Sequence, residues 1–385
     1  MSEPLRIGFV AGESSGDQLG AALIRALRER APGVRCYGVA GAKMQAAGCD
    51  VWASSDELAV MGLVEPLKRL PRLLRLRGML RSRFRAERPD AFVGIDAPAF
   101  NLGLEAQLKR AGLRTVQYVS PQVWAWRQSR VRAIARACDL VLCLLPFETD
   151  FYERHGVRAL FVGHPLADQI PLDVDRAAAR RELGVDPTAT LVALLPGSRI
   201  GEVERLGGDF LAAARWLRER RANLEFMAPM ASPSVRALFE RQCAAAGVPG
   251  VRVIEGHAQS VLAASNAVLV ASGTATLDTL LSKRPMVVAY RFGALTAFVI
   301  RRFGLVKVPY FSQPNLLVGR RLVPEFFQEA VTAEALGAAL LAELDDPARA
   351  TELEAEFRRV HEQLRRGGAE RAAAAILDLV GSRAA

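Results

Sequence analysis

The segment RIGFVAGESSGD, residues 6–17, places an apolar run directly before a turn rich in Gly, Ser and Asp. The run is typical of a buried parallel strand, and the turn leads into a helical pattern at 18–31. The same succession returns at TLVALLPGSR, residues 190–199. Such strand–turn–helix units predict an α/β fold with parallel sheets that carry helices on both faces.

Apolar runs of this kind alternate with helical patterns along most of the chain. We expect strands at 6–11, 35–39, 91–95, 115–119, 140–145, 190–195, 224–228, 251–254, 267–271 and 286–290. Helices are expected between them, for example at 18–31, 101–111, 208–220 and 235–246. The Pro- and Asp-containing segment 163–186 precedes the second strand–turn–helix start, and 385 residues are too many for one comfortable core. We therefore predict two domains, 1–168 and 169–350, followed by C-terminal helices at 351–385 that break at Gly367-Gly368.

The composition limits the class of protein and of partner. The net charge of +10 and the pI of about 9.9 favour an anionic partner, which could be nucleic acid, anionic lipid or a phosphorylated substrate. Five cysteines form no C-x-x-C pair, which argues against a disulfide framework and for a reducing cytosol. The N-terminus runs straight into a strand, so no signal peptide is expected. The longest uncharged run, 256–277, is broken by Ser, Asn, Gly and Thr and is interpreted as buried strand and turns.

Parallel sheets bind ligands at the carboxyl ends of their strands, and two acidic residues of the first half follow strand ends. Glu13 lies in the turn after the first strand, and no turn requires a carboxylate there. Asp96 ends the run GID, where a partly desolvated carboxylate could take a proton from a hydroxyl group. The alternative is that Asp96, or Asn101 after it, caps the following helix. The tryptophans of VWAWR, residues 123–127, could wall a pocket, meet lipid headgroups or pack in the core.

In the second half, two strand-end loops suit a diphosphate. In PGSR, the guanidinium of Arg199 can bind phosphate and Ser198 lies beside it, although a surface arginine in a turn is the alternative. The loop ASGTATLD places Gly and hydroxyl groups at a helix N-terminus, where they can cradle phosphate oxygens, and places an acid one turn later for ribose hydroxyls. The candidate residues in that loop are Ser272, Gly273, Thr274, Thr276 and Asp278. Weaker amide and acid signals follow at Asn315, Glu325 and Gln328.

Residues 63–85 form a basic amphipathic segment with eight Lys or Arg and one acid. We expect a helix, broken or kinked near Pro71, that contacts a membrane surface. Bulky leucines and the scarcity of aromatic residues favour lipid over nucleic acid, and packing on its own domain is the alternative. The predicted membrane contacts are Leu63, Val64, Leu67, Leu70, Leu73, Leu74 and Leu76.

Taken in order, GESSGDQLGA, LAVMGLVEPLKRLPRLL, GIDAPAFN, YVSPQVWAWR, FVGHPL, LLPGSR, ASGTATLD and VPEFFQ resemble the lipid-A-disaccharide synthase family through nearly the whole chain. The resemblance implies a GT-B glycosyltransferase with two Rossmann-like domains that face each other across a cleft. It implies no metal and no cofactor. It also implies a cytoplasmic enzyme, peripheral on the inner membrane, and homo-oligomers occur in the family, so a homodimer is one expected assembly.

The implied reaction joins UDP-2,3-diacylglucosamine to 2,3-diacylglucosamine 1-phosphate, which gives the lipid A disaccharide 1-phosphate and UDP. The N-terminal domain would take the acceptor and meet the membrane, and the C-terminal helices would pack back on it. Residues 169–350 would bind the nucleotide sugar. Asp96 would be the base, Arg199 would hold the diphosphate, and Glu13 and Asn315 would lie near the sugars.

This sequence departs from the family pattern at two positions: Ala99 stands where Asp is usual, and Asp278 stands where Glu is usual. Three alternative functions remain open from the sequence. They are a peptidoglycan-type N-acetylglucosaminyl transferase, a UDP-sugar 2-epimerase, and a non-catalytic module that binds membrane or nucleic acid. The first is expected to carry a Gly-Gly-His loop near its start, which this chain lacks.

Overall fold

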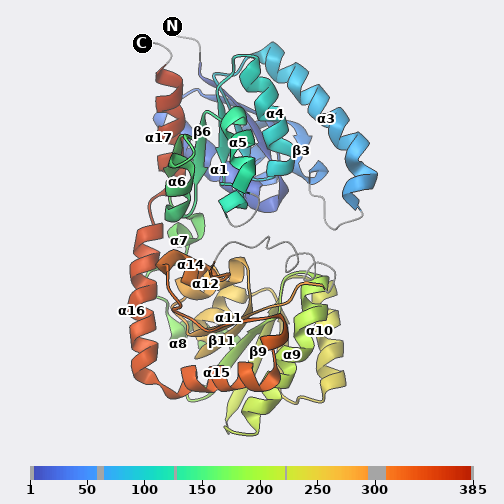
Figure 1. Ribbon diagram of the computed structural model, residues 1–385, viewed down its shortest axis with the longest axis vertical. Coiled ribbons are helices and arrows are strands. Elements are labelled where there is room, and N and C mark those ends of the chain that lie inside the picture. The colour runs from blue at the N-terminus through green and yellow to red at the C-terminus, as the bar shows by residue number, and fades with distance from the viewer. Residues whose placement is uncertain (1–3, 59–64, 125–127, 222, 294–308, 383–385) are drawn as a thin grey trace. The chain divides into compact units, whose positions relative to one another are not determined.

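The computed structural model describes residues 4–58, 65–124, 128–221, 223–293 and 309–382. The chain divides into two compact units (Figure 1). Unit 1 comprises Met1–Asp168 and Leu364–Ala385, and unit 2 comprises Gln169–Gln363. The first division falls inside the Pro- and Asp-containing segment 163–186. The return to unit 1 comes at Leu364, later than the expected boundary at 351, because α16 (Pro347–Leu364) belongs to unit 2.

Unit 1 contains a parallel sheet of seven strands in the order β3-β2-β1-β4-β5-β6-β7. The strands are β1 (Arg6–Ala11), β2 (Arg35–Ala40), β3 (Cys49–Ser54), β4 (Ala91–Ile95), β5 (Thr115–Tyr118), β6 (Leu140–Cys143) and β7 (Ala159–Phe161). Strands β3 and β7 were not expected from the sequence. Both lie at an edge of the sheet and are only partly buried.

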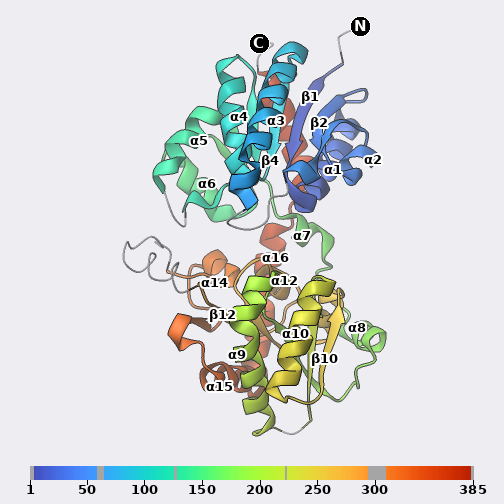
Figure 2. The same ribbon diagram turned by 90° about the vertical axis from the view of Figure 1, so that its right-hand side faces the viewer.

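Helices cover both faces of this sheet (Figure 2). The helices of unit 1 are α1 (Glu13–Arg30), α2 (Ala42–Ala46), α3 (Glu65–Glu87), α4 (Pro98–Arg110), α5 (Val131–Ala137), α6 (Pro146–Glu153), α7 (Pro165–Gln169, which crosses the division) and α17 (Gly368–Gly381). On one face, α1 and α17 pack against β1 and its neighbours, with Ile24 and Ile376 fully buried. On the other, Phe84 of α3 and Leu104 of α4 pack against Phe92 of β4. Unit 1 is thus a three-layer Rossmann-like domain completed by a helix from the end of the chain.

Unit 2 contains a six-stranded parallel sheet in the order β10-β9-β8-β11-β12-β13. Its strands are β8 (Thr190–Leu195), β9 (Leu224–Met230), β10 (Val251–Glu255), β11 (Ala267–Ala271), β12 (Met286–Tyr290) and β13 (Glu325–Phe327). Its remaining helices are α8 (Arg176–Leu183), α9 (Ile200–Arg218), α10 (Pro233–Ala246), α11 (Ala258–Ala264), α12 (Thr274–Leu281), α14 (Gln313–Val318) and α15 (Ala333–Asp345). Residues of α9, α10 and α15 bury one face of the sheet, with Phe210, Phe239 and Leu340 fully buried. The predicted fold class is confirmed: both sheets are parallel and both units are Rossmann-like.

Of the predicted break or kink near Pro71, the break is wrong, because α3 runs through Pro71 as one helix, and the kink stays a prediction. A proline inside a helix removes one main-chain donor and crowds the preceding turn. Helix α3 tolerates it on its outer side, where Pro71 is exposed.

Candidate functional site

The turn after β4 is the most constrained strand end of unit 1. Asp96 and Ala97 both adopt left-handed conformations, with φ of 52° and 43°. Helix α4 begins at Pro98 and its N-cap residue is Ala97, whose methyl side chain cannot accept a hydrogen bond from the helix. The helix-capping interpretation of Asp96 and Asn101 is therefore wrong. Asp96 is half-buried in a turn whose conformation no cap explains.

The first loop packs directly on this turn. A Cβ atom built on Gly12 would lie 2.6 Å from the Cβ of Ala97, so glycine is required for this approach. The amide of Gly12 also donates to the carbonyl of Ile95, at 3.4 Å. Glu13 is the first residue of α1, and its side chain lies outside the described part of the structure. The two carboxylate-bearing loops predicted at strand ends are thus brought together at one edge of the sheet.

The third strand-end motif of unit 1 packs against α6. The indole of Trp124 donates to the carboxyl group of Glu148, at 3.0 Å, and its ring meets Phe147 edge-on. Glu148 also accepts the main-chain amide of Leu145 at the start of α6, and burial raises its pKa to about 7. Trp124 therefore has the packing role that was one of its alternatives, whereas Ala125, Trp126 and Arg127 lie outside the described residues.

In unit 2, the loop after β8 presents an exposed guanidinium. The carboxylate of Glu202 accepts the amides of Ser198 and Arg199, at 3.0 and 3.3 Å, and pairs with Nη1 of Arg199, at 3.2 Å. Gly197 has a φ of 138° and approaches the Glu202 side chain closely. The side chain of Arg199 is 72% exposed, so its remaining donors are free to meet an anion.

The loop after β11 divides into exposed and buried members. Gly273 and Thr274 are exposed at the N-terminus of α12. Thr276 is fully buried: its hydroxyl donates to the carbonyl of Gly273, at 2.8 Å, and accepts the amide of Gln313, at 3.2 Å. The hydroxyl of Ser272 donates to the carbonyl of Phe311, at 2.8 Å. The predicted substrate contact of Thr276 is therefore corrected to a structural role. Contact through Ser272 stays a prediction.

Asp278 lies one turn into α12 and is half-buried. Burial raises its pKa to about 6, and the Gln259 amide donates to its carboxylate at 2.9 Å, which opposes that rise. A partner from α11 therefore holds this carboxylate in place. Sequence reasoning missed Gln259, because a polar residue on a helix gives no signal of the acid it reaches.

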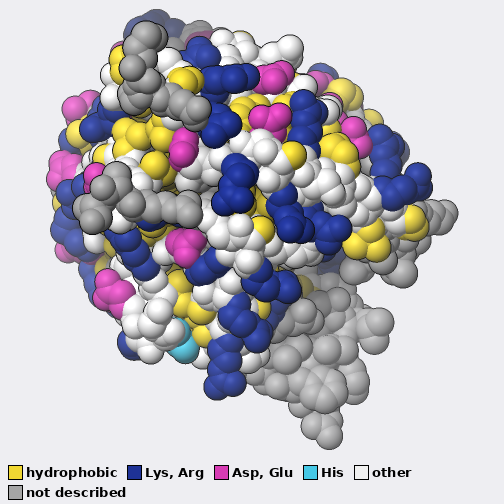
Figure 3. Space-filling view, turned by 90° about the horizontal axis from the view of Figure 1, so that it is seen from above, with side chains coloured by type: hydrophobic (Ala, Val, Ile, Leu, Met, Phe, Trp, Pro, Cys, Tyr) yellow, Lys and Arg dark blue, Asp and Glu magenta, His cyan; other side chains and the backbone are white. Residues whose placement is uncertain are grey.

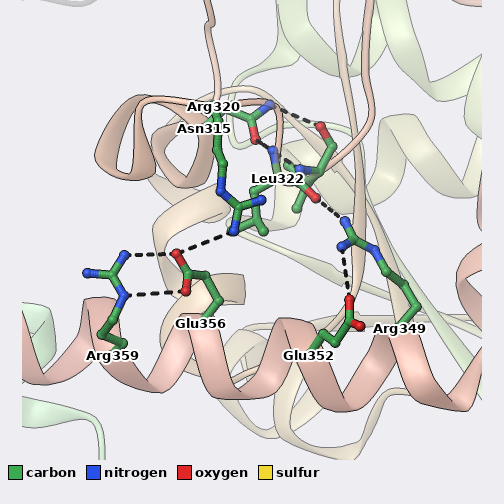
Figure 4. Close-up of polar contacts among 8 residues, drawn as sticks. Asn315, Arg320, Leu322, Arg349, Glu352, Glu356 and Arg359 are labelled. Atoms are coloured by element: carbon green, nitrogen blue, oxygen red, sulfur yellow. Dashed lines mark hydrogen bonds and ion pairs between the residues drawn. The ribbon is translucent and has the colours of Figure 1, made fainter.

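The predicted contact of Asn315 with substrate is wrong, because Asn315 is fully buried. Its amide oxygen accepts the main-chain amides of Leu322 and Val323, at 2.7 and 2.9 Å, and its nitrogen donates to the Val323 carbonyl, at 3.0 Å. Figure 4 shows this clamp beside the ion pairs of Glu356 on α16, with Arg359 of the same helix at 2.8 Å and with Arg320 at 3.7 Å. Asn315 therefore fixes the segment between α14 and β13.

Glu325 and Gln328 hold the neighbouring loop ends. The Glu325 carboxylate accepts the amide of Ser312, at 2.8 Å, and the side-chain oxygen of Gln328 accepts the amide of Phe292, at 2.9 Å. Both side chains are half-buried. Their predicted contact with substrate stays a prediction, and these bonds show that they already order the rim of the sheet.

The described part of α3 packs mainly on its own domain. Leu76 is 7% exposed and belongs to the core with Leu80 and Phe84, so its predicted membrane contact is wrong. Leu73 is partly buried against the same core. Leu74 is 52% and Met79 42% exposed. Leu63 and Val64 lie outside the described residues, as do the side chains of Leu67 and Leu70.

Several arginines of α3 have partners in unit 1. Arg72 pairs with Glu57, at 3.2 Å, and the guanidinium of Arg83 lies 3.8 Å from the ring centroid of Trp52. Figure 3 views the molecule from the end at which Figure 1 labels both termini. It shows Lys and Arg side chains spread over this face with hydrophobic side chains between them. The charge of this face is therefore not confined to one stripe.

No group of three or more His, Cys, Asp or Glu side chains in the described residues could hold a metal ion. No helix among them is long and apolar enough to cross a bilayer.

Solved structures with a similar fold include an epimerase and a glycosyltransferase. A UDP-GlcNAc 2-epimerase from Neisseria meningitidis aligns with a TM-score of 0.65 at 9% identity, over 98% of this chain and 100% of that one. WaaG, a glycosyltransferase involved in lipopolysaccharide biosynthesis, aligns with a TM-score of 0.57 at 13% identity, over 97% and 99%. These identities are too low to distinguish a transferase from an epimerase, so they establish the fold alone.

Sequence comparison distinguishes a transferase from an epimerase. The family model described as lipid-A-disaccharide synthetase matches residues 7–379. Lipid-A-disaccharide synthase from Sodalis glossinidius is 53% identical over 380 residues, which are 98% of this chain and 99% of the relative. The enzyme of the same name from Pseudomonas syringae pv. tomato is 52% identical over 381 residues, 99% of each. The epimerase, peptidoglycan-transferase and non-catalytic alternatives are therefore not favoured, and the chain belongs to the lipid-A-disaccharide synthase family of glycosyltransferases, which act in lipid A biosynthesis.

Proposed function

We propose that this chain joins UDP-2,3-diacylglucosamine to 2,3-diacylglucosamine 1-phosphate by an inverting single displacement. The acceptor 6-hydroxyl oxygen attacks the anomeric carbon of the donor and passes its proton to the carboxylate of Asp96. The bond from the anomeric carbon to the diphosphate breaks, and UDP leaves with the electron pair. The products are the β-1′,6-linked disaccharide 1-phosphate and UDP.

The turn at Asp96 is the observation that carries the assignment of the base. Its carboxylate follows a buried strand, lies half-buried at the ligand edge of the sheet and does not cap a helix. A carboxylate in such a position can be partly desolvated and still reach a substrate hydroxyl. Glu13, in the loop that packs on this turn, is the next candidate.

The leaving diphosphate is assigned to two features of unit 2. The exposed guanidinium of Arg199 supplies a charge-assisted donor, and the start of α12 at Gly273 and Thr274 supplies main-chain amides and the positive end of a helix dipole. Together they can stabilise the negative charge that develops on UDP. Asp278 is then placed to accept ribose hydroxyls, and Ser198 lies beside Arg199.

The test compares Asp96→Asn with a matched control in the same unit. Asp96→Asn should bind UDP like wild type in calorimetry but lose about 10²–10⁴ in turnover, because an amide cannot take the proton. Asp50→Asn changes an exposed carboxylate on β3 and should leave turnover unchanged. Turnover of Asp96→Asn within a few-fold of wild type would make Glu13 the next base to test.

We further propose that the enzyme works in the cytoplasm as a peripheral protein on the inner membrane, because the acyl chains of both substrates favour the bilayer. The supporting surface is the outer side of α3, where Leu74 and Met79 lie exposed among arginines. An apolar side chain in the interface and nearby cations both favour an anionic surface. A homodimer stays a prediction, which sedimentation of the purified chain would check.

A further inference from the structure

Three residues with left-handed backbones lie at the ends of two paired strands in unit 1. Strands β4 and β5 are neighbours, with Ile95 opposite Tyr118. Directly after them come Asp96 and Ala97, with φ of 52° and 43°, and Val119, with φ of 77°. A β-branched residue in this region is a conformational outlier, and such conformations persist only where the surroundings impose them. Something must therefore hold this edge of the sheet.

The side-chain amide of Gln117 is one group that does so. Gln117 is fully buried inside the otherwise apolar end of β5. Its nitrogen donates to the carbonyl of Asp96 at 3.1 Å, and also lies within hydrogen-bond distance of the carbonyls of Tyr118 and Val119, at 3.4 and 3.2 Å. One amide thus joins the two left-handed strand ends.

Asn101 of α4 holds the same carbonyl from the other side. Its side-chain nitrogen donates to the carbonyl of Asp96 at 2.8 Å, and also approaches the carbonyl of Val10 in β1, at 3.3 Å. The main-chain amide of Asp96 donates to the carbonyl of Tyr118, at 2.9 Å. The main chain of Asp96 is therefore fixed at both its amide and its carbonyl, while Asn101 and Gln117 are too deeply buried to meet a substrate.

Stability alone does not explain why amide side chains occupy positions 101 and 117. The side-chain oxygens of Asn101 and Gln117 are buried and have no hydrogen-bond partner among the described residues. A buried polar atom without a partner is unfavourable, and an apolar side chain of the same shape would avoid it. Both amides do, however, donate to the carbonyl of Asp96. The conformation of that turn sets the direction of the Asp96 side chain.

We propose that Gln117 and Asn101 are positioning residues that hold the Asp96 turn in its left-handed conformation and thereby aim its carboxylate at the acceptor hydroxyl. This inference rests on the proposed role of Asp96 as the base. It adds two residues that touch no substrate and whose loss should slow the chemical step while donor binding in unit 2 is unchanged.

The decisive variant is Gln117→Met, which keeps the length of the side chain and removes its donors. A misplacement of a reacting group by about 1 Å can cost on the order of 10²-fold in rate, so we expect kcat to fall by about 10- to 100-fold. The affinity for UDP, measured by calorimetry, should stay at the wild-type value. Adding Ala97→Gly to this variant should restore part of kcat, because glycine adopts positive φ without strain.

Thr115→Val is the matched control, at the opposite end of the same strand. The hydroxyl of Thr115 is buried and donates to the carbonyl of Ala137, at 2.7 Å. Its loss should lower the melting temperature and leave kcat unchanged, so it reports what a buried hydrogen bond in β5 contributes to stability alone. If Gln117→Met does not fold, Asn101→Ala removes the other donor to the same carbonyl and is read in the same way.

The outcomes separate this inference from the proposed function. A folded Gln117→Met or Asn101→Ala variant with wild-type kcat, alongside an inactive Asp96→Asn, would overturn the positioning role and leave the base assignment standing. An active Asp96→Asn would overturn the base assignment itself, whatever the amide variants do. A fall in kcat that Thr115→Val reproduces would reduce the amides to ordinary structural contacts.

Discussion

Replacing Leu76 by alanine should lower the free energy of unfolding by about 2–5 kcal/mol, the usual cost of truncating a fully packed leucine. Leu76 is 7% exposed and packs with Leu80 and Phe84 on the inner side of α3. Leu74 lies two residues away and is 52% exposed. Its replacement by alanine should change the free energy of unfolding by no more than about 0.5 kcal/mol. Urea unfolding of both variants measures this difference.

The same two positions also test the membrane proposal, in which the exposed Leu74, and not the buried Leu76, should contribute to binding. A leucine that passes fully from water into an apolar environment gains about 1.5–3 kcal/mol. Because Leu74 is about half exposed, only about 1 kcal/mol of this is available to an interface, which corresponds to roughly 5-fold in affinity. Leu74→Ser should therefore weaken binding to anionic vesicles about 5-fold in a sedimentation assay. The loss should be clearest at high salt, where the arginines contribute least.

Two results would refute this reasoning. If Leu74→Ser binds vesicles like wild type at high salt, the described part of α3 is not the docking surface. If Leu76→Ala is as stable as wild type, then α3 does not depend on its inner leucines, and its packing has been misjudged. Met79→Ser, at a position 42% exposed, should behave like Leu74→Ser and serves as an independent check.

Three further predictions concern catalysis and pH. Arg199→Ala should lose about 2–4 kcal/mol of transition-state stabilisation without a change in melting temperature, since its side chain is 72% exposed; near-normal kcat would reject its role. Treatment with EDTA should leave turnover intact, because the described residues contain no set of metal ligands; activity that returned only with Mg²⁺ would contradict this. Burial raises the pKa of Asp278 from 3.8 to about 6, so the folded chain binds this proton more tightly than the unfolded chain. The free energy of unfolding should therefore fall as the pH rises from about 4 to 6, and Asp278→Asn should flatten that dependence in melts recorded across this range.

The sheet cores were predictable because their strands are continuous apolar runs. Strands β1, β4, β8, β11 and β12 begin and end where the sequence placed them. Two of the missed strands, β3 and β13, do not have that pattern, and the third, β7, is apolar but only three residues long. In β3, Asp50 and Ser54 are exposed at the sheet edge, and β13 is three residues long and begins with Glu325. Edge and short strands are buried on fewer sides, so their sequences carry less of the signal that marks a strand.

The sequence predicted the starts of α1 and α9 too late in the chain, for a related reason. Helix α1 begins at Glu13 rather than at residue 18, and α9 at Ile200 rather than at residue 208. Their first turns contain Gly, Ser and acidic residues, which resemble loop composition. These residues instead form the first turns of helices that follow a strand end directly, where glycine permits close approach.

The candidate site was predictable in position but not in the division of roles among its residues. A polar residue after a strand can meet a ligand or satisfy the main chain of a neighbouring loop, and the sequence looks the same in both cases. Thr276 and Asn315 turned out to serve the main chain. Gln117 lies inside a strand rather than after one, so its position did not mark it as a candidate. The sequence marked Gln117 only as an amide side chain within an apolar run.

Burial now sorts the predicted residues of unit 2 into two groups with different expected consequences. Thr276 and Asn315 are fully buried and bonded within the fold, so their replacement should lower stability first and activity only as a result. Arg199 and Thr274 are exposed, so their replacement should change donor binding or turnover while the fold stays intact. Thr276 accepts the main-chain amide of Gln313, and Asn315 accepts those of Leu322 and Val323, so the first group orders the segment that follows Ser312. In this unit, function should therefore be sought in residues whose loss leaves the melting temperature unchanged.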